Sequence, residues 1–294
     1  MSLTFLAAAV LAALEAPAPA PGLTVRASPA TPLQGGVTAI TITSKRPLAA
    51  LELVDGDTRF PLERTAGGTT FRGLYGVDLA AASGAHRVVF EAPDGAQRLA
   101  WTLKIAAGRF SVQRLSVNTR YVEVPKEEQE RIKADQARVE EAYRRGSAVR
   151  LWTSFARPVN APSQGNFGAR RVYNGKTRSS HAGLDLAAGE GTPVAAAADG
   201  RVVLAGDLYF SGGTVLLDHG AGLFTQYFHL SRIDVKEGDT VAKGARLGAS
   251  GHTGRVTGPH LHWGAKLFGA RVNPEDLLAL DAWPLPGAEP RPVN

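Results

Sequence analysis

The chain has 294 residues, which is long for one domain and comfortable for two. Its formal net charge of +6 is spread along the sequence, at about +1, +3 and +2 for the parts divided after residues 106 and 150, which excludes a concentrated nucleic-acid-binding arm. The absence of cysteine excludes disulfides, thiolate zinc sites and cysteine nucleophiles together, so that any zinc has to bind His, Asp or Glu. A basic chain of this kind suits an anionic polymer as a partner.

The first part of the chain has the composition of an export signal. Residues 3–14 form an apolar run that is too short for a bilayer-spanning helix, and small residues and prolines follow in 15–22. We expect residues 1–21 to be a signal peptide and the protein to be exported, to the periplasm or cell envelope. The basic residues that usually precede such a run are missing, and a disordered or core-packed N-terminus is the alternative. No other segment is apolar and long enough to span a membrane.

The next part, 22–106, breaks into short alternating runs separated by glycine-containing turn signals. The runs are 23–27, 37–43, 51–54, 87–91 and 99–105. Strands at this spacing predict an Ig-like β-sandwich, so the fold class is predominantly all-β. This part contains no cluster of catalytic residue types.

Residues 107–150 are expected to be a linker with a helix. Good helix formers and charges fill 126–145, and Gly146 stands where a helix commonly ends. The apolar stripe is thin, chiefly Ile132, Val139 and Tyr143, so the helix can bury only a narrow face.

Residues 151–280, followed by a tail at 281–294, contain six of the seven histidines among short strands and glycine turns. His181 and Asp185 are four residues apart, a spacing that places two side chains on one face in a helix and in a strand alike. Gly183 and the glycine-rich surroundings favour an extended or bent segment. In either geometry both side chains reach one ion.

A second cluster is the triplet His260, Leu261, His262. In a strand, the two-residue period puts both imidazoles on one face and Leu261 on the other. Such a pair suits metal binding or proton transfer, and His262 is available as the third ligand of a zinc site that keeps one position for water. The alternative is that both histidines only line a polar groove.

A further histidine, His229, lies in the apolar run 224–230. Alternation predicts Thr225, Tyr227 and His229 on one face, with Phe224, Phe228 and Leu230 toward the packed side. The surplus of histidines over three ligands leaves groups that can move a proton and stabilise an oxyanion.

Together these motifs resemble those of one family. HxxxD at 181–185, Tyr-Phe-His-Leu at 227–230 and Gly-Pro-His-Leu-His-Trp at 258–263, with the segment 167–175 ahead of them, are similar to the motifs of the lysostaphin/LytM-type zinc metallopeptidases, endopeptidases that cut the peptides of peptidoglycan. The resemblance covers about 152–280. It implies an antiparallel β-sheet domain with an active-site groove over 151–280, zinc (Zn2+) bound by His181, Asp185 and His262, and catalytic roles for His229 and His260.

The resemblance leaves several points open. D-alanyl to diamino-acid cross-links are the expected substrate, and a glycine bridge is the alternative. Which of His229 and His260 is the base is open, and Tyr173, Arg171 and Asn174 are candidates for oxyanion or substrate binding. The rival to an enzyme is a non-catalytic activator or envelope scaffold of the same fold. The N-terminal sandwich is also a candidate for intramolecular inhibition, by filling the groove.

Overall fold

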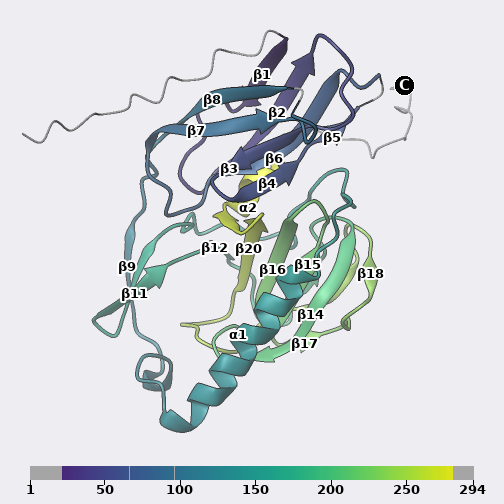
Figure 1. The fold of residues 1–294 in the computed structure, drawn as a ribbon. Coiled ribbons are helices and arrows are strands. Elements are labelled where there is room, and N and C mark those ends of the chain that lie inside the picture. The colour runs from purple at the N-terminus through teal and green to yellow at the C-terminus, as the bar shows by residue number, and fades with distance from the viewer. Residues whose placement is uncertain (1–21, 66, 96, 281–294) are drawn as a thin grey trace, which may run out of the picture.

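The computed structural model describes residues 22–280 apart from residues 66 and 96, as a sandwich of strands above a second β-sheet region that carries one long helix (Figure 1). The predicted signal peptide at 1–21 and the tail at 281–294 lie outside the described residues. Among the helices that are described, none has the length and apolar character needed to cross a membrane.

The first region consists of two four-stranded antiparallel sheets. One has the order β1 (Leu23–Ser28), β2 (Val37–Ser44), β6 (Thr70–Gly76), β5 (Glu63–Arg64). The other has the order β4 (Thr58–Pro61), β3 (Glu52–Asp55), β7 (Gly84–Glu91), β8 (Arg98–Ile105). Ile40 and Phe71 of the first sheet pack with Leu53, Phe90 and Leu103 of the second in one buried cluster, which is the core expected of a sandwich.

The segment after the sandwich contains one strand and the predicted helix. Strand β9 (Val112–Leu115) is followed by the 3-10 turns η1 (Thr119–Tyr121) and η2 (Lys126–Glu128) and by α1 (Gln129–Arg144). Ala142 is fully buried, and Val139 and Tyr143 pack against the same apolar cluster, so only a narrow face of α1 is covered. The helix runs along the β14–β16 sheet in Figure 1, and its contacts there are chiefly with β14.

The second region is built on an antiparallel sheet with the order β12 (Gly183–Leu186), β20 (Leu261–Leu267), β16 (Leu223–Leu230), β15 (Gly212–Asp218), β14 (Gly200–Leu208), β18 (Thr240–Val241), and with β21 (Ala270–Val272) on β20. A smaller sheet joins β13 (Pro193–Ala195), β19 (Arg246–Ala249) and β17 (Arg232–Ile233). Val194 and Leu247 of the smaller sheet pack on Leu184, Tyr227 and Trp263 of the larger one, so the core lies between the two.

A third sheet of this region joins the segment 107–125 to its side, through strand β9. Strand β10 (Arg170–Tyr173) lies between β11 (Lys176–Ser180), which it pairs with in antiparallel fashion, and β9, which it pairs with in parallel. The short helix α2 (Pro274–Leu278) closes the described chain at the sandwich.

The sandwich and the second region meet at the turn between β20 and β21. There the ring of Phe268 lies 4.7 Å from that of Phe60, edge to face, and the Asp78 carboxylate pairs with Arg271.

The elements of both regions confirm the prediction of a predominantly β fold. The Ig-like character of the sandwich and the boundaries after 106 and 150 stay predictions.

Candidate metal centre

Two adjacent strands and the turn before one of them bring three ligand-type side chains together. Asp185 of β12 lies directly opposite His262 of β20 in the antiparallel register, so the two side chains share one face of the sheet. His181 stands in the turn between β11 and β12. All three side chains are buried, and one donor atom of each converges on a common point.

The spacing of the donor atoms fits one metal ion. Nε2 of His181 is 2.8 Å from Nδ1 of His262, and each of these nitrogens is 3.1 Å from Oδ1 of Asp185. Ligands at the zinc distances of a tetrahedral site are separated by about 3.3 Å, close to these values. The lone pairs of the two imidazoles and the carboxylate oxygen of Asp185 therefore form a set of ligands for a cation.

The second carboxylate oxygen of Asp185, Oδ2, accepts hydrogen bonds from two side chains. Nδ2 of Asn166 donates to Oδ2 at 2.9 Å, and the Arg171 guanidinium donates to the same oxygen. Burial alone would raise the pKa of Asp185, but the two imidazoles of His181 and His262 beside its Oδ1 outweigh burial and hold that pKa well below its ordinary value. The carboxylate is therefore ionised and leaves Oδ1 for the ion.

Asn166 also orients the first histidine ligand. Its backbone carbonyl accepts from Nδ1 of His181 at 3.0 Å, and because a carbonyl can only accept, Nδ1 carries the proton and Nε2 keeps its lone pair. Its side-chain oxygen accepts the backbone N–H of Asp185 at 3.0 Å. Asn166 is thus a positioning residue for two ligands at once.

The third ligand is fixed by an aromatic ring. Phe228 stacks on His262 with ring centroids 5.0 Å apart and planes within 3° of parallel. Burial lowers the pKa of His262 to about 4, so the imidazole is neutral near pH 7 and free to bind a cation.

Two more histidines lie beside these ligands. Nε2 of His260 is 3.5 Å from Oδ1 of Asp185, and the His229 ring centroid is 4.9 Å from that of His260. In each ring Nδ1 donates to a backbone carbonyl, Thr253 O for His229 and Gly258 O for His260, both at 2.8 Å. Burial, with His262 and His260 nearby, lowers the pKa of His229 well below its ordinary value, so that ring is neutral and its Nε2 carries a lone pair.

The predicted alternation in β16 holds from Phe224 to Phe228, but the predicted faces are wrong and His229 does not continue the period. Phe228 pairs with His262 and lies on the site face, whereas Tyr227 pairs with Trp263 and is buried in the core. His229 has a positive φ of 65° and its N–H donates to Ser211 O at 2.9 Å, outside the regular ladder. This local break, rather than the two-residue period, brings His229 beside the other histidines.

By contrast, the triplet 260–262 behaves as its period predicts. His260 and His262 both approach Asp185, and Leu261 lies fully buried in the core on the other side. The structure therefore brings all five predicted groups, His181, Asp185, His229, His260 and His262, into one cluster.

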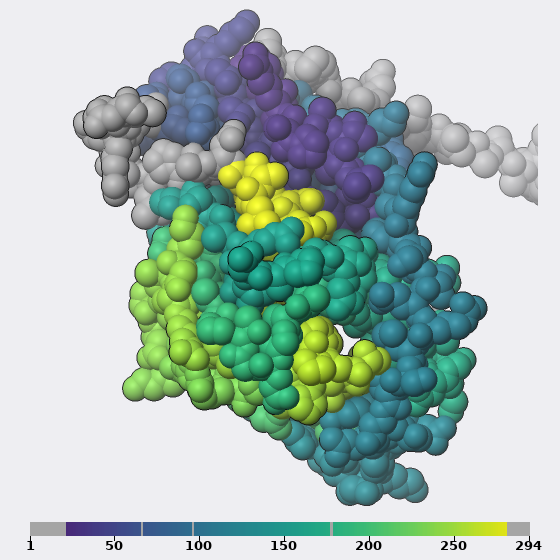
Figure 2. All heavy atoms as spheres, turned by 180° about the vertical axis from the view of Figure 1, so that it is seen from behind, coloured from purple at the N-terminus to yellow at the C-terminus, as the bar shows by residue number. Residues whose placement is uncertain are grey.

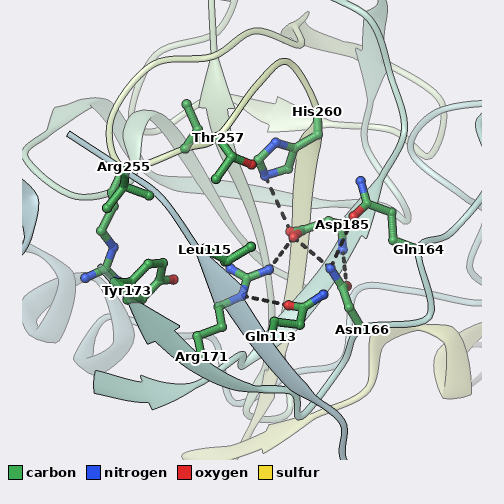
Figure 3. A pocket seen from close by; sticks show the side chains of 12 residues that line it. Gln113, Leu115, Gln164, Asn166, Arg171, Tyr173, Asp185, Arg255, Thr257 and His260 are labelled. Atoms are coloured by element: carbon green, nitrogen blue, oxygen red, sulfur yellow. Dashed lines mark hydrogen bonds and ion pairs between the residues drawn. The ribbon is translucent and has the colours of Figure 1, made fainter. Parts of the chain in front are cut away.

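A groove opens from this cluster on the face seen in Figure 2, between the yellow-green atoms of the later part of the chain and the blue atoms of the segment after the sandwich. Its walls come from the segment after the sandwich, from residues 164–173 and from the loop before β20 (Figure 3). The lining residues are Gln113, Leu115, Val117, Gln164, Asn166, Arg171, Tyr173, Asp185, Arg255, Val256, Thr257 and His260.

Of the three substrate or oxyanion candidates, two line the groove. Arg171 and Tyr173 do so, whereas the exposed Asn174 is not among the lining residues and its amide bonds to the backbone N–H and C=O of Val117, which does line the groove. Asn166, Gln113 and Arg255 were not singled out by the sequence, because their roles depend on contacts between segments far apart in the chain. The described residues of the sandwich do not line the groove, so the structure lends no support to inhibition by the sandwich.

Comparison with known proteins places this geometry in a family. Residues 179–274, which include all five clustered groups, match the model for Peptidase family M23. A crystal structure of a putative peptidase M23 from Pseudomonas aeruginosa is 30% identical with a TM-score of 0.66, and the match covers 84% of this chain and 95% of that one.

Two curated relatives each match about a third of this chain. The peptidoglycan DD-endopeptidase ShyA of Vibrio cholerae is 45% identical over 109 residues, which is 37% of this chain and 25% of the relative. The DD-carboxypeptidase/endopeptidase Mpg of Neisseria meningitidis is 46% identical over 94 residues, 32% of this chain and 22% of the relative. The match thus spans about a quarter of the length of these relatives. From the clustered groups, the family match and the agreement over nearly the whole Pseudomonas structure, we conclude that the chain belongs to peptidase family M23.

Proposed function

We propose that the protein is a zinc-dependent endopeptidase that hydrolyses peptide cross-links of peptidoglycan, at the bond between D-alanine and a diamino acid. The observation that carries the proposal is the convergence of the donor atoms of His181, Asp185 and His262 beside two further buried histidines. The names of the relatives, peptidoglycan DD-endopeptidase and DD-carboxypeptidase/endopeptidase, support the substrate.

In this proposal His181, Asp185 and His262 hold the ion, which when bound supplies Lewis-acid chemistry and lowers the pKa of water. In both His229 and His260 the Nδ1 atom donates to a backbone carbonyl, which leaves Nε2 as the atom that can exchange a proton with the reactants. One of them accepts the proton of the attacking water at Nε2 and then passes it to the leaving amine. The other donates to the oxyanion at the scissile carbonyl from an Nε2 that carries a proton, as an imidazolium. Tyr173 is the candidate for a further donor to that oxyanion, since it lines the same groove.

A location outside the cytoplasmic membrane follows from the substrate, because peptidoglycan is an envelope polymer. The relative named as a peptidoglycan DD-endopeptidase supports this, and we propose that the chain acts in the periplasm or envelope.

The test is zinc content by elemental analysis together with digestion of purified cross-linked peptidoglycan, read out by mass spectrometry. We expect about one zinc per chain and products cut at the peptide cross-link. His262→Ala removes metal and activity together, because it deletes a ligand. His229→Ala keeps the metal and lowers kcat by roughly 100-fold or more, because proton transfer loses a partner.

The matched control is His252→Ala, since His252 is an exposed histidine, with 58% of its side chain accessible, that pairs with Glu190. It is expected to leave both readouts unchanged. Loss of zinc from the His229→Ala variant would contradict the division between ligands and proton carriers. Zinc binding without cleavage of any cross-link would favour a non-catalytic role.

A further inference from the structure

A second charged group stands across the groove from the candidate metal centre. Arg255 lies in the loop before β20, and its guanidinium lies over the rings of Tyr173 at 4.5 Å and Phe210 at 4.9 Å from the centroids. Figure 3 shows Arg255 beside Tyr173 on one side of the pocket and Asp185 with His260 on the other. Two aromatic rings therefore hold the guanidinium at the groove wall.

The loop that carries Arg255 is tied to the catalytic histidines. The backbone N–H of Arg255 donates to Phe210 O at 2.8 Å, and the Thr253 hydroxyl accepts the Gly213 N–H at 2.9 Å. The carbonyl of Thr253 is the acceptor for Nδ1 of His229. The distance between Arg255 and the reacting centre is thus set by a short, hydrogen-bonded stretch of chain.

The charges of the groove favour an anionic group on the substrate. Its charged lining residues are Arg171, Arg255 and Asp185, and Asp185 is engaged by Arg171 and faces the histidines. A bound divalent ion makes the groove more positive. The planar guanidinium of an arginine carries paired N–H donors whose geometry matches the two oxygens of a carboxylate.

We propose that Arg255 is a substrate-binding residue that recognises a free carboxylate of the peptide next to the scissile bond. This inference rests on the proposed peptidase function and adds to it the chemical feature by which the substrate is selected. The aromatic rings of Tyr173 and Phe210 hold the guanidinium ready, so that little side-chain entropy is lost when the carboxylate binds.

The experiment compares two synthetic cross-linked peptide dimers, one with free carboxylates next to the cross-link and one in which those groups are carboxamides. We expect the zinc-loaded wild-type chain to prefer the carboxylate dimer by roughly 10- to 100-fold in kcat/KM, the size of a charge-assisted hydrogen-bonded pair. Arg255→Gln loses this preference while binding the same amount of zinc, and Arg255→Lys keeps part of it.

The control is Arg98→Gln in β8 of the sandwich, an arginine with 63% of its side chain exposed. It keeps the full preference. A wild-type chain that cuts both dimers equally, or an Arg255→Gln variant that loses the same factor on both, would overturn the assignment of Arg255 and leave the peptidase function standing.

Calorimetric titration of both dimers separates the two proposals if the zinc-loaded chain cleaves neither. In that case the peptidase function fails. Tighter binding of the carboxylate dimer, abolished in Arg255→Gln, would still support the site, and equal binding of both dimers would refute it.

Discussion

At the scale of single residues, the candidate metal centre depends on a position where no side chain fits. A Cβ on Gly183 would lie 2.4 Å from Nε2 of His262 and 2.8 Å from the backbone oxygen of Trp263. The backbone oxygen of Trp263 cannot move easily, so an added Cβ would push against the imidazole of His262 instead. The imidazole can therefore keep its position only if residue 183 lacks a side chain. Gly183 is therefore part of the ligand geometry although it contributes no ligand.

We predict that Gly183→Ala displaces His262 and weakens zinc binding roughly 10-fold or more, a typical cost of disturbing a group that supports a ligand. Competition with a chromophoric chelator measures the dissociation constant. Gly189→Ala is the matched control, since a Cβ there meets nothing within 4 Å, and it should bind zinc as the wild type does. Equal affinity of both variants would show that the site relaxes around the added methyl group.

At the scale of elements, a buried histidine joins the ends of three strands. Nδ1 of His219, just after β15, donates to Asp199 O, just before β14, at 2.7 Å. Its Nε2 lies 2.7 Å from the hydroxyl of Thr225 in β16 and accepts from it. His219 is not among the residues that line the groove, which agrees with a structural role. Burial lowers the pKa of His219 to about 4, because a charged imidazole would be desolvated there.

This pKa predicts how stability changes with pH. The pKa of His219 is 6.5 in the unfolded chain and about 4 in the folded chain. Between these two pH values the unfolded chain binds a proton at His219 and the folded chain does not. The free energy of unfolding is therefore unaffected by His219 above the unfolded pKa and falls as the pH drops through this window. By linkage, His219 accounts for a loss of about 2 kcal/mol between about pH 7.5 and about pH 5.

Urea unfolding of the wild type and of His219→Gln at the two pH values checks this. Gln cannot take up the proton, so the variant should lose about 2 kcal/mol less than the wild type over the same interval, while other histidines titrate alike in both. The same slope in both proteins would mean that His219 is protonated in the folded state.

At the scale of the whole molecule, the sandwich is joined to the catalytic region by a buried ion pair. The Arg150 side chain is only 4% exposed, and its guanidinium meets both carboxylate oxygens of Glu63 in β5, at 2.8 and 3.0 Å. The guanidinium also lies over the ring of the fully buried Trp152. A cation in such a place depends on its counter-charge far more than a surface arginine does.

We predict that Glu63→Gln lowers the free energy of unfolding by about 3 kcal/mol, because it leaves the buried guanidinium without its carboxylate. Glu91→Gln is the control, since its partner Arg98 is 63% exposed at 3.7 Å, and it should cost no more than about 0.5 kcal/mol. Urea unfolding measures both. A Glu63→Gln variant as stable as the control would show that the junction carries little of the stability.

The sequence by itself determined the kinds of element and the inventory of the site. Period-two runs predicted the strands of the sandwich, helix formers with a closing glycine predicted α1, and HxxxD with HLH supplied His181, Asp185, His260 and His262. These signals are local, because side chains two residues apart share a face in a regular strand and side chains four residues apart do so in a strand or a helix.

Only the tertiary structure decided how His229 enters the site and which residues support the ligands. The positive φ of His229 is stabilised by Ser211 and Thr253, which lie 18 and 24 residues away, so strict alternation assigned Phe228 and Tyr227 to the wrong faces. Asn166, Gln113 and Arg255 likewise act through contacts between distant segments. Such contacts form only when the sheets pack against one another, and for that physical reason the spacing of residues in the sequence does not predict them.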